Sequence, residues 1–233
     1  MEIRVLGTGS KGNCYFVRMG ETALLLECGI PIREIRKRLG MAFLDVDACL
    51  ISHSHKDHSL ALKDVLKAGI ACMTSRSTAD ALGIDDFRLT RLEDAGGRAS
   101  LPGGSFLQAF PLEHDVTGHL GFRIQSSEGV LVYITDTMYS RYTFPGMTHL
   151  MIECNYIKEI LDENVRQGRV PVELRNRIVQ THMSLETVKK LLEMNNLTHL
   201  QEIHLLHLSD QNSDEGWMKR EIQAIAGVPV YVA

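Results

Sequence analysis

One short segment of the sequence concentrates side chains that bind metal ions. Ser52-His-Ser-His-Lys-Asp-His58 places three imidazoles and one carboxylate within six positions. Imidazole nitrogen and carboxylate oxygen are the ligands that zinc and related divalent ions take, at roughly 2.0–2.2 Å. The segment directly follows an apolar run, so a loop at a strand end is expected. Such a loop predicts two ligand pairs, one for each of two ions: His53 with His55, and Asp57 with His58.

Two ions need more ligands than one loop supplies, and three further candidates stand at the ends of later apolar runs. His114 follows Phe106–Pro111, Asp136 follows the run that ends at Thr135, and His207 ends a run of its own. Each position alone is weak evidence for a metal ligand, because a single His or Asp at a strand end is commonly just solvated. Their joint pattern favours a binuclear centre of seven ligands over a polar loop that happens to be rich in histidine.

The elements expected to position these residues alternate between strands and helices. Strands are predicted at Ile3–Leu6, Cys14–Met19, Thr22–Glu27, Ala48–Ser52, Ala71–Thr74, Phe106–Pro111, Gly118–Gln125, Val130–Thr135, Leu150–Glu153, Glu202–His207 and Val228–Val232. Helices are predicted at Pro31–Leu39, Leu60–Ala68, Ser75–Leu82, Ile157–Gln167 and Pro171–Val179, and two more begin at the N-caps Ser184 and Ser213. Two β-rich blocks with helices outside indicate the α/β class and a four-layer αββα sandwich. Without a linker or a low-complexity tract, residues 1–233 are expected to form one domain.

Bulk composition narrows the function classes. A net charge of −4 argues against a generally basic surface that coats nucleic acid. Five cysteines without paired spacing indicate reduced thiols. The chain starts with a strand pattern and not with a basic stretch followed by an apolar one, and its longest early aliphatic run is Ala23–Leu26. We therefore expect a cytoplasmic protein that has no membrane partner.

The order of these candidate ligands resembles a known family. His53-x-His55-x-Asp57-His58, followed by His114, Asp136 and His207, is similar to the metallo-β-lactamase superfamily over essentially the whole chain. Within that superfamily the chain most resembles the YycJ/WalJ branch and its phage-borne relatives, near ribonuclease Z. The segments that carry this closer resemblance are Gly7–Asn13, Glu153–Tyr156, Thr181–Ser184 and His207–Asn212.

The resemblance implies a ligand set and a nucleophile. His53, His55 and His114 would hold one ion, Asp57, His58 and His207 the other, and Asp136 would bridge them. The two ions per chain would be Zn²⁺ or Mn²⁺, with iron as a third candidate. A water between them would lose a proton near neutral pH and attack as hydroxide. Relatives often carry Asp where Glu27 stands. The resemblance implies that this residue orients a metal ligand, and Glu27 would do so with a longer side chain.

One histidine remains after the ligands are assigned. His182 lies just before a helix, as does the non-ligand histidine of ribonuclease Z relatives, where it stabilises phosphate and protonates the leaving oxygen. Asp57 and His182 are therefore the predicted catalytic residues, with Glu153 or Asn155 as candidates to orient His182. The alternative is a helix-start histidine that hydrogen-bonds only locally.

The resemblance implies a phosphodiesterase, in particular a nuclease for DNA or RNA that forms homodimers, as relatives near ribonuclease Z commonly do. The acidic charge and small size favour a cyclic-nucleotide diester as the alternative substrate. Thioester or lactone hydrolysis is a further alternative, against which His182 and the His207–Ser209 context argue. A non-catalytic binding protein fits poorly, because a structural metal site is usually closed and single. No β-CASP domain stands between Asp136 and His207, which argues against the larger RNA-processing members.

Some conspicuous residues receive ordinary interpretations. His119, His149, His199 and His204 fall inside or beside strand patterns and are expected to pack or to lie on the surface. The arginines of the region after Glu153 alternate with glutamates, which favours a solvated mixed-charge face over a nucleic-acid groove. These arginines are Arg166, Arg169, Arg175 and Arg177.

Overall fold

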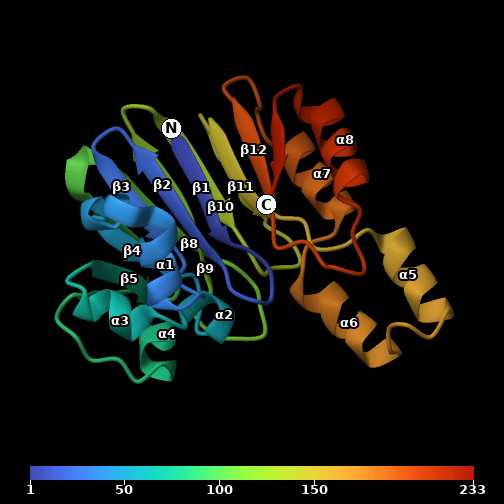
Figure 1. Ribbon diagram of the computed structural model, residues 1–233. Coiled ribbons are helices and arrows are strands. Elements are labelled where there is room, and N and C mark those ends of the chain that lie inside the picture. Colours follow the sequence, from blue (N-terminus) through green and yellow to red (C-terminus); the bar gives the residue numbers. More distant parts are fainter. The chain divides into compact units, whose positions relative to one another are not determined.

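The computed structural model describes all 233 residues, which form two compact units (Figure 1). The first unit consists of Met1–Pro111 and Val116–Gly129, and the second of Leu112–Asp115 and Val130–Ala233. Each unit combines parallel strands with helices, which confirms the predicted α/β class. The prediction of one domain for the whole chain stays a prediction.

The first unit contains a six-stranded sheet with the order β1-β2-β3-β4-β5-β6. Its strands are β1 (Glu2–Gly7), β2 (Cys14–Met19), β3 (Thr22–Leu26), β4 (Ala48–Leu50), β5 (Ala71–Ser75) and β6 (Leu89–Leu92). The pairs β1–β2 and β2–β3 are antiparallel, and the remaining pairs are parallel. Parallel β3 and β4 end at the same edge of the sheet, so the chain segments that follow Leu26 and Leu50 emerge side by side there.

Helices and a second group of strands complete the first unit. The helices are α1 (Ile32–Leu39), the 3-10 helix η1 (Gly40–Asp45), α2 (Lys56–Ser59), α3 (Leu62–Lys67) and α4 (Arg76–Ala81). Apolar residues of α1 and α3, among them Ile35 and Val65, are fully buried in one core cluster with Phe16 of β2. An antiparallel series follows: β7 (Gly97–Ser100), the 3-10 turn η2 (Pro102–Gly104), β8 (Phe106–Pro111) and β9 (Leu120–Ser126).

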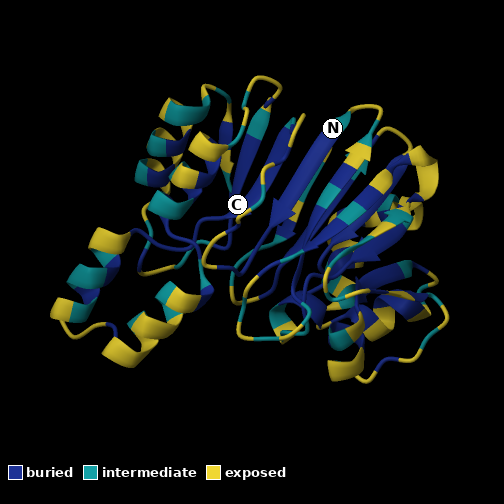
Figure 2. Ribbon diagram, turned by 180° about the vertical axis from the view of Figure 1, so that it is seen from behind, coloured by how far each residue is buried: buried dark blue, intermediate teal, exposed yellow.

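The second unit is built on four parallel strands. These are β10 (Gly129–Ile134), β11 (His149–Glu153), β12 (Glu202–Leu206) and β13 (Val230–Val232), each paired with the next. Its helices are α5 (Lys158–Arg166), α6 (Val172–Thr181), α7 (Leu185–Met194) and α8 (Glu215–Ala226). In Figure 2 the strands are largely dark blue, while the helices carry yellow on their outer faces. Because the strands are parallel, Asp136, Glu153 and His207 reach the same edge of this sheet.

Most predicted elements are present, and the differences have local causes. The strand bounds Cys14–Met19 and Phe106–Pro111 are as predicted, and the Ser184 hydroxyl caps α7 by accepting from Thr187 N at 3.2 Å. The predicted Ser213 cap is wrong: Asp214 Oδ1 accepts from Trp217 N at 2.7 Å, whereas Ser213 Oγ donates to Ser209 O.

The helix predicted at Leu60–Ala68 begins earlier and is interrupted. A four-residue helix, α2, comes first and contains Asp57 and His58. Ala61 then departs from helical angles before α3 begins. The short strands β6 and β7 were not predicted, because each has only four residues and neither contains an apolar run or a regular alternation of apolar and polar residues. None of the helices has both the length and the apolar character needed to cross a bilayer.

Candidate metal centre

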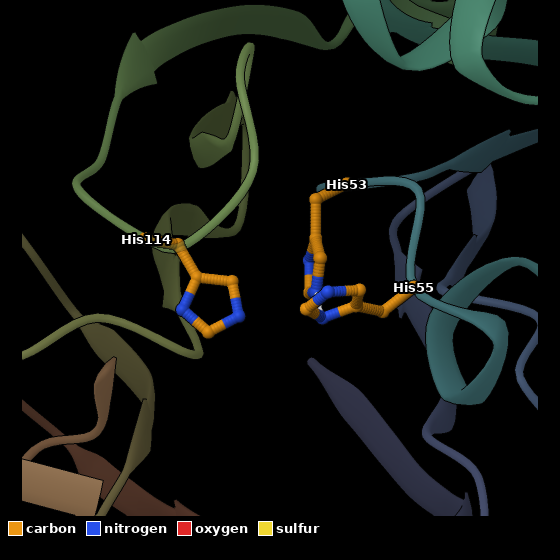
Figure 3. A group of neighbouring side chains, drawn as sticks. All are labelled: His53, His55 and His114. Atoms are coloured by element: carbon orange, nitrogen blue, oxygen red, sulfur yellow. Dashed lines mark hydrogen bonds between the residues drawn. The ribbon is translucent and has the colours of Figure 1, made fainter. Parts of the chain in front are cut away.

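The first predicted ligand pair lies on the loop after β4. Ser52 N–H donates to the Glu27 carboxylate at 3.2 and 3.3 Å, and Ser52 Oγ lies 2.8 Å from His53 Nδ1. With its Nδ1 held in this way, the buried His53 places Nε2 3.1 Å from His55 Nδ1 (Figure 3). Two imidazole nitrogens this close must share a cation or a proton between them. The arrangement therefore fits a metal ion bound by both rings.

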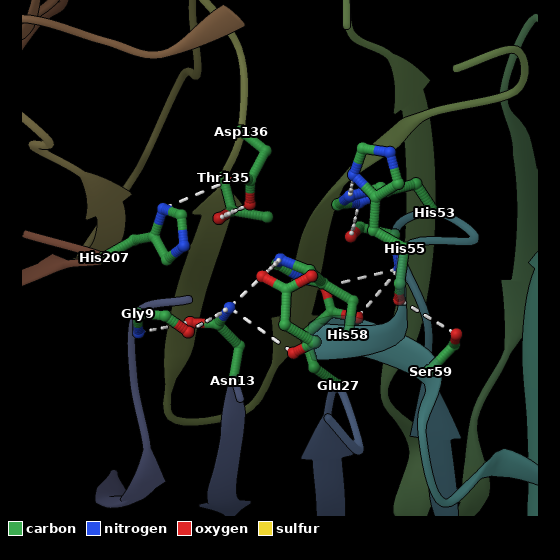
Figure 4. A network of polar contacts seen from close by, with 12 residues as sticks. Gly9, Asn13, Glu27, His53, His55, His58, Ser59, Thr135, Asp136 and His207 are labelled. Atoms are coloured by element: carbon green, nitrogen blue, oxygen red, sulfur yellow. Dashed lines mark hydrogen bonds and ion pairs between the residues drawn. The ribbon is translucent and has the colours of Figure 1, made fainter. Parts of the chain in front are cut away.

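The second predicted pair lies in α2. The fully buried His58 ring places Nε2 3.4 Å from Asp57 Oδ2 and 3.0 Å from Asn13 Nδ2 (Figure 4). Its other nitrogen, Nδ1, lies 3.5 Å from Glu27 Oε1. The Glu27 carboxylate thus contacts both the ring of this pair and the backbone just before the first pair. The structure brings all four residues of the motif together within the first unit.

A cluster of acids and imidazoles forms in the second unit around Glu153. Glu153 Oε1 lies 2.5 Å from His182 Nδ1 and 2.9 Å from His207 Nδ1, and Asp136 Oδ1 is 3.4 Å from each of these nitrogens. Glu153 Oε2 accepts from the backbone N–H of Thr137 and of Met183, at 3.3 and 3.1 Å. These four ionisable side chains lie close enough to share one cation. Sequence reasoning assigned Glu153 only a candidate orienting role, but the structure makes it the centre of the cluster.

Electrostatics in this cluster follow from burial opposed by ion pairing. Burial lowers the pKa of His182, but the Glu153 carboxylate more than offsets this and raises it to about 9. The pKa of His207 is also raised, because Asp136 and Glu153 outweigh its burial. Burial raises the pKa of Glu153, yet the neighbouring imidazoles bring it below its ordinary value. The metal-free cluster therefore holds protons that a divalent ion would displace on binding.

His114 lies on the loop after β8, in the second unit. Its ring centroid is 6.0 Å from that of His182, and its Nε2 is 3.1 Å from Asp115 Oδ1. Asp115 also contacts Arg177 of α6, at 3.3 Å. The second unit thus gathers four of the predicted site residues near one end of its sheet: His114, Asp136, His182 and His207.

A histidine that the sequence did not single out lies beside the motif. His119 was expected to pack or to lie on the surface. It is buried, and its ring centroid is 4.6 Å from that of His53. The next residue, Leu120, donates its N–H to Ser52 O at 3.0 Å, which holds the start of β9 against the motif. No local pattern marks this contact, because it joins segments more than sixty positions apart.

The backbone is strained at three of the residues described above, one in the first unit and two in the second. Glu27, Asp136 and His207 have φ values of 63°, 48° and 54°, and they are the only residues other than glycine with positive φ. Side chains with a Cβ rarely adopt this region, and such outliers cluster at functional sites.

Comparison with known proteins establishes the family. Residues 7–146, more than half of the chain, match the Metallo-beta-lactamase superfamily. The chain belongs to this superfamily, as its motif predicted, and it is a metal-dependent hydrolase by class.

Individual relatives agree with this assignment. Exodeoxyribonuclease WalJ of Streptococcus pneumoniae is 25% identical over 225 residues, which cover 90% of this chain and 82% of the relative. Ribonuclease Z of Mycobacterium bovis is 28% identical over 177 residues, covering 59% and 63%. The crystal structure of the metallo-β-lactamase fold protein YhfI from Bacillus subtilis aligns with a TM-score of 0.73 at 18% identity and covers 99% of this chain and 95% of its own. The predicted fold is thereby confirmed.

Proposed function

We propose that the protein is a metal-dependent phosphodiesterase that acts on DNA or RNA. The observation that carries the proposal is the contact of Glu153 with both His182 and His207. A thioester releases a thiolate that leaves without strong acid assistance, whereas the alkoxide of a phosphodiester benefits from a proton donor. A histidine held beside a metal ligand suits this task. The similarity to an exodeoxyribonuclease and to ribonuclease Z supports the same substrate class.

Two divalent ions, Zn²⁺ or Mn²⁺, are the proposed cofactors. The proposed ligands are His53, His55 and His114 for one ion and Asp57, His58 and His207 for the other, with Asp136 shared. The donor set fits, because it consists of imidazole nitrogens and carboxylate oxygens, and two pairs of them already converge in the first unit. When bound, such ions lower the pKa of a water molecule and hold phosphoryl oxygens.

Two residues of the chain have proposed catalytic roles. His182 binds Glu153 through Nδ1, which leaves Nε2 to donate a proton to the departing oxygen. The Glu153 carboxylate is itself fixed by two backbone N–H groups, so it holds the orientation of the ring. Asp57 offers a half-buried carboxylate next to His58 Nε2 and can orient an attacking water.

A substrate panel with metal-reconstituted protein tests the reaction class. Activated aryl phosphodiester, the matching monoester, a thioester and a lactone are compared at equal concentrations, alongside single- and double-stranded DNA and RNA. We expect the aryl diester to be turned over fastest among the small substrates and at least one nucleic acid to be cleaved. Preferential turnover of the thioester would overturn the proposal.

Salt dependence separates a polymer from a small diester. A nuclease that holds several phosphates releases counterions, so its affinity falls steeply with salt. Two arginines of the region after Glu153 already pair with acids: Arg175 lies 3.2 Å from Asp162, and Arg166 pairs with Glu163. We expect the affinity for DNA or RNA to fall steeply with salt, and to fall as steeply when the charge of Arg166 is reversed. The reason is that the Arg166–Glu163 pair is exposed and its two charges already neutralise each other. A shallow slope on every nucleic acid would favour the cyclic-nucleotide alternative. The cytoplasmic location and the homodimer stay predictions.

A further inference from the structure

Helix α1 concentrates positive charge in a chain whose net charge is −4. Four of its eight residues are basic and one is acidic. The apolar residues Ile35 and Leu39 are buried in the core of the first unit. Residues three and four positions apart are neighbours on a helix surface, so Arg33, Arg36 and Lys37 follow one another along one side of α1, and all three are exposed. We call these three residues the α1 stripe.

The remaining basic residue of α1 serves the fold. Arg38 donates from Nη1 to the carbonyl of Leu6 in β1. Its own carbonyl accepts from Arg4 Nη2 at 2.7 Å, which is a second bond between α1 and β1. The positive charge of Arg38 is therefore used to join the helix to the edge of the sheet.

The α1 stripe has no comparable use within the protein. Lys37 and Arg36 form no ion pair, and Arg33 lies 3.9 Å from the neighbouring Glu34, with its side chain 85% exposed. Arg33 also stands in the first turn of α1, where the positive end of the helix dipole disfavours a cation. Helix stability therefore does not account for the stripe, and its charges face solvent largely without acidic partners.

The stripe begins close to the metal motif. The chain just before α1 contacts α2, because Cys28 N–H donates to His58 O at 2.8 Å and a Cβ on Gly29 would lie 1.7 Å from Asp57 O. Figure 1 shows α1 and α2 as neighbours in the first unit. Four residues separate Gly29 from Arg33, and four residues of chain span at most about 14 Å. One strand of a nucleic-acid duplex carries a phosphate about every 3.4 Å of axis, so the stripe lies within a few nucleotides of the motif.

We propose that the α1 stripe binds the phosphate backbone of a nucleic-acid substrate on one side of the reacting diester. This inference rests on the proposed function and says which surface of the first unit holds the polymer. Lys and Arg bind phosphates without reading the sequence, so the stripe adds affinity for a strand of DNA or RNA alike. Arg166 and Arg175 of the second unit, in contrast, already pair with acids.

An anionic membrane is the other surface that a row of cations attracts. A helix that lies on a membrane inserts its own apolar face, but the apolar residues of α1 are buried in the protein core. Nucleic acid therefore fits α1 better. Because Met41 and Leu44 of the adjacent η1 are exposed, anionic vesicles are included in the test.

The salt dependence of binding tests the proposal. Affinity for a labelled oligonucleotide is measured by fluorescence anisotropy over a range of salt concentrations with metal-reconstituted protein. Phosphorothioate linkages keep the backbone charge and slow cleavage. Arg33 and Lys37 are about 6 Å apart along the helix, which corresponds to about two phosphates of one strand. Replacing Arg33, Arg36 and Lys37 together by Gln should therefore reduce the slope of log K against log salt by about 2 on duplex and about 1.5 on single strands.

Matched variants separate the stripe from net charge and from folding. Lys190, Lys219 and Arg220 are exposed on α7 and α8, and their joint replacement by Gln changes the net charge equally. This control should leave the slope unchanged. Arg33→Gln alone removes a cation that does not stabilise α1, so it should fold as the wild type does and reduce the slope by about one. All these variants should hydrolyse an activated aryl diester at the wild-type rate, because that substrate has only one phosphate.

The outcomes distinguish this inference from the proposed function. A wild-type protein that neither binds nor cleaves any nucleic acid would refute the proposed function. Cleavage by the wild type, together with an undiminished salt slope in both Arg33→Gln and the triple variant, would refute the stripe and leave the function standing. An equal loss in the control triple would assign the effect to net charge. Stripe-dependent binding to phosphatidylserine vesicles, with unchanged binding to nucleic acid, would show that the surface serves a membrane instead.

Discussion

Gly29→Ala is the sharpest test of how the metal motif is positioned. Gly29 has no positive φ, so alanine meets no backbone strain there. A Cβ at this position would lie 1.7 Å from Asp57 O and 2.3 Å from Asp57 C, both backbone atoms that cannot rotate away. The substitution therefore acts by pushing α2 away from the segment after β3 that contains Cys28 and Gly29.

The size of the effect follows from the distances. Ordinary contact begins near 3.4 Å, so Asp57 O must move by about 1.7 Å. Two backbone hydrogen bonds hold α2 here, from Asn13 N to Asp57 O at 2.7 Å and from Cys28 N to His58 O at 2.8 Å, and a shift of this size breaks them. At about 0.5–1.5 kcal/mol each, their loss lowers the free energy of unfolding by roughly 1–3 kcal/mol. Displacing Asp57 by more than about 1 Å should slow turnover by on the order of 10²-fold.

Urea unfolding and diester turnover measure both effects. Gly97→Ala is the matched control, because Gly97 also lacks positive φ and its Cβ would meet Leu92 Cδ2 at 3.5 Å, an ordinary contact. We expect the control to stay close to the wild type in both assays. A Gly29→Ala protein as stable and as active as Gly97→Ala would show that the backbone approach at Gly29 does not position the motif.

Two other perturbations address the chemistry and the metals. His182→Ala should retain its metals and slow an aryl diester only slightly, but it should slow a nucleotide diester with an alkoxide leaving group by on the order of 10²-fold, because only the alkoxide needs a proton. Equal slowing of both substrates would contradict the acid role. Careful metal analysis should approach two ions per chain, and their removal by a chelator should lower the melting temperature, since ions that bind the folded state stabilise it. Superimposable melting curves with and without metal would refute this coupling.

The candidate ligands could be selected from the sequence because their types and spacing are those of metal-binding side chains. Three imidazoles and a carboxylate after an apolar strand have few structural uses, and the local geometry of His53–His58 agrees with the two pairs expected. The parallel strands of the second unit explain why two of the later candidates, Asp136 and His207, could also be selected. Asp136 follows β10 and His207 follows β12, which are parallel strands on either side of β11 in one sheet, so both residues emerge at one edge. A sequence pattern that alternates strands and helices predicts that arrangement.

The supporting residues were not predictable, because their contacts join segments distant in the sequence. Glu153 reads as the last residue of an apolar strand, yet it contacts His182 and His207, 29 and 54 positions away. Asn13 reads as a turn residue, and its contact with His58 spans 45 positions. A buried polar side chain needs partners, but the sequence does not say which ones. For the same reason His119 looked like an ordinary core histidine.

Backbone strain adds an argument that neither composition nor motif supplies. Glu27 and His207 come directly after β3 and β12, and Asp136 follows β10 closely; each adopts a positive φ that costs about 1–3 kcal/mol. The surroundings hold two of them firmly: Glu27 N–H donates to Leu50 O at 2.9 Å, and the His207 carbonyl accepts from Asn155 Nδ2 at 2.8 Å. A glycine would adopt these angles without strain. The chain instead places two acids and an imidazole at these positions. Each of these side chains can bind a metal or orient its ligand, and the chain keeps them although the strained backbone lowers its stability. Such a loss of stability in favour of function is expected at a catalytic centre.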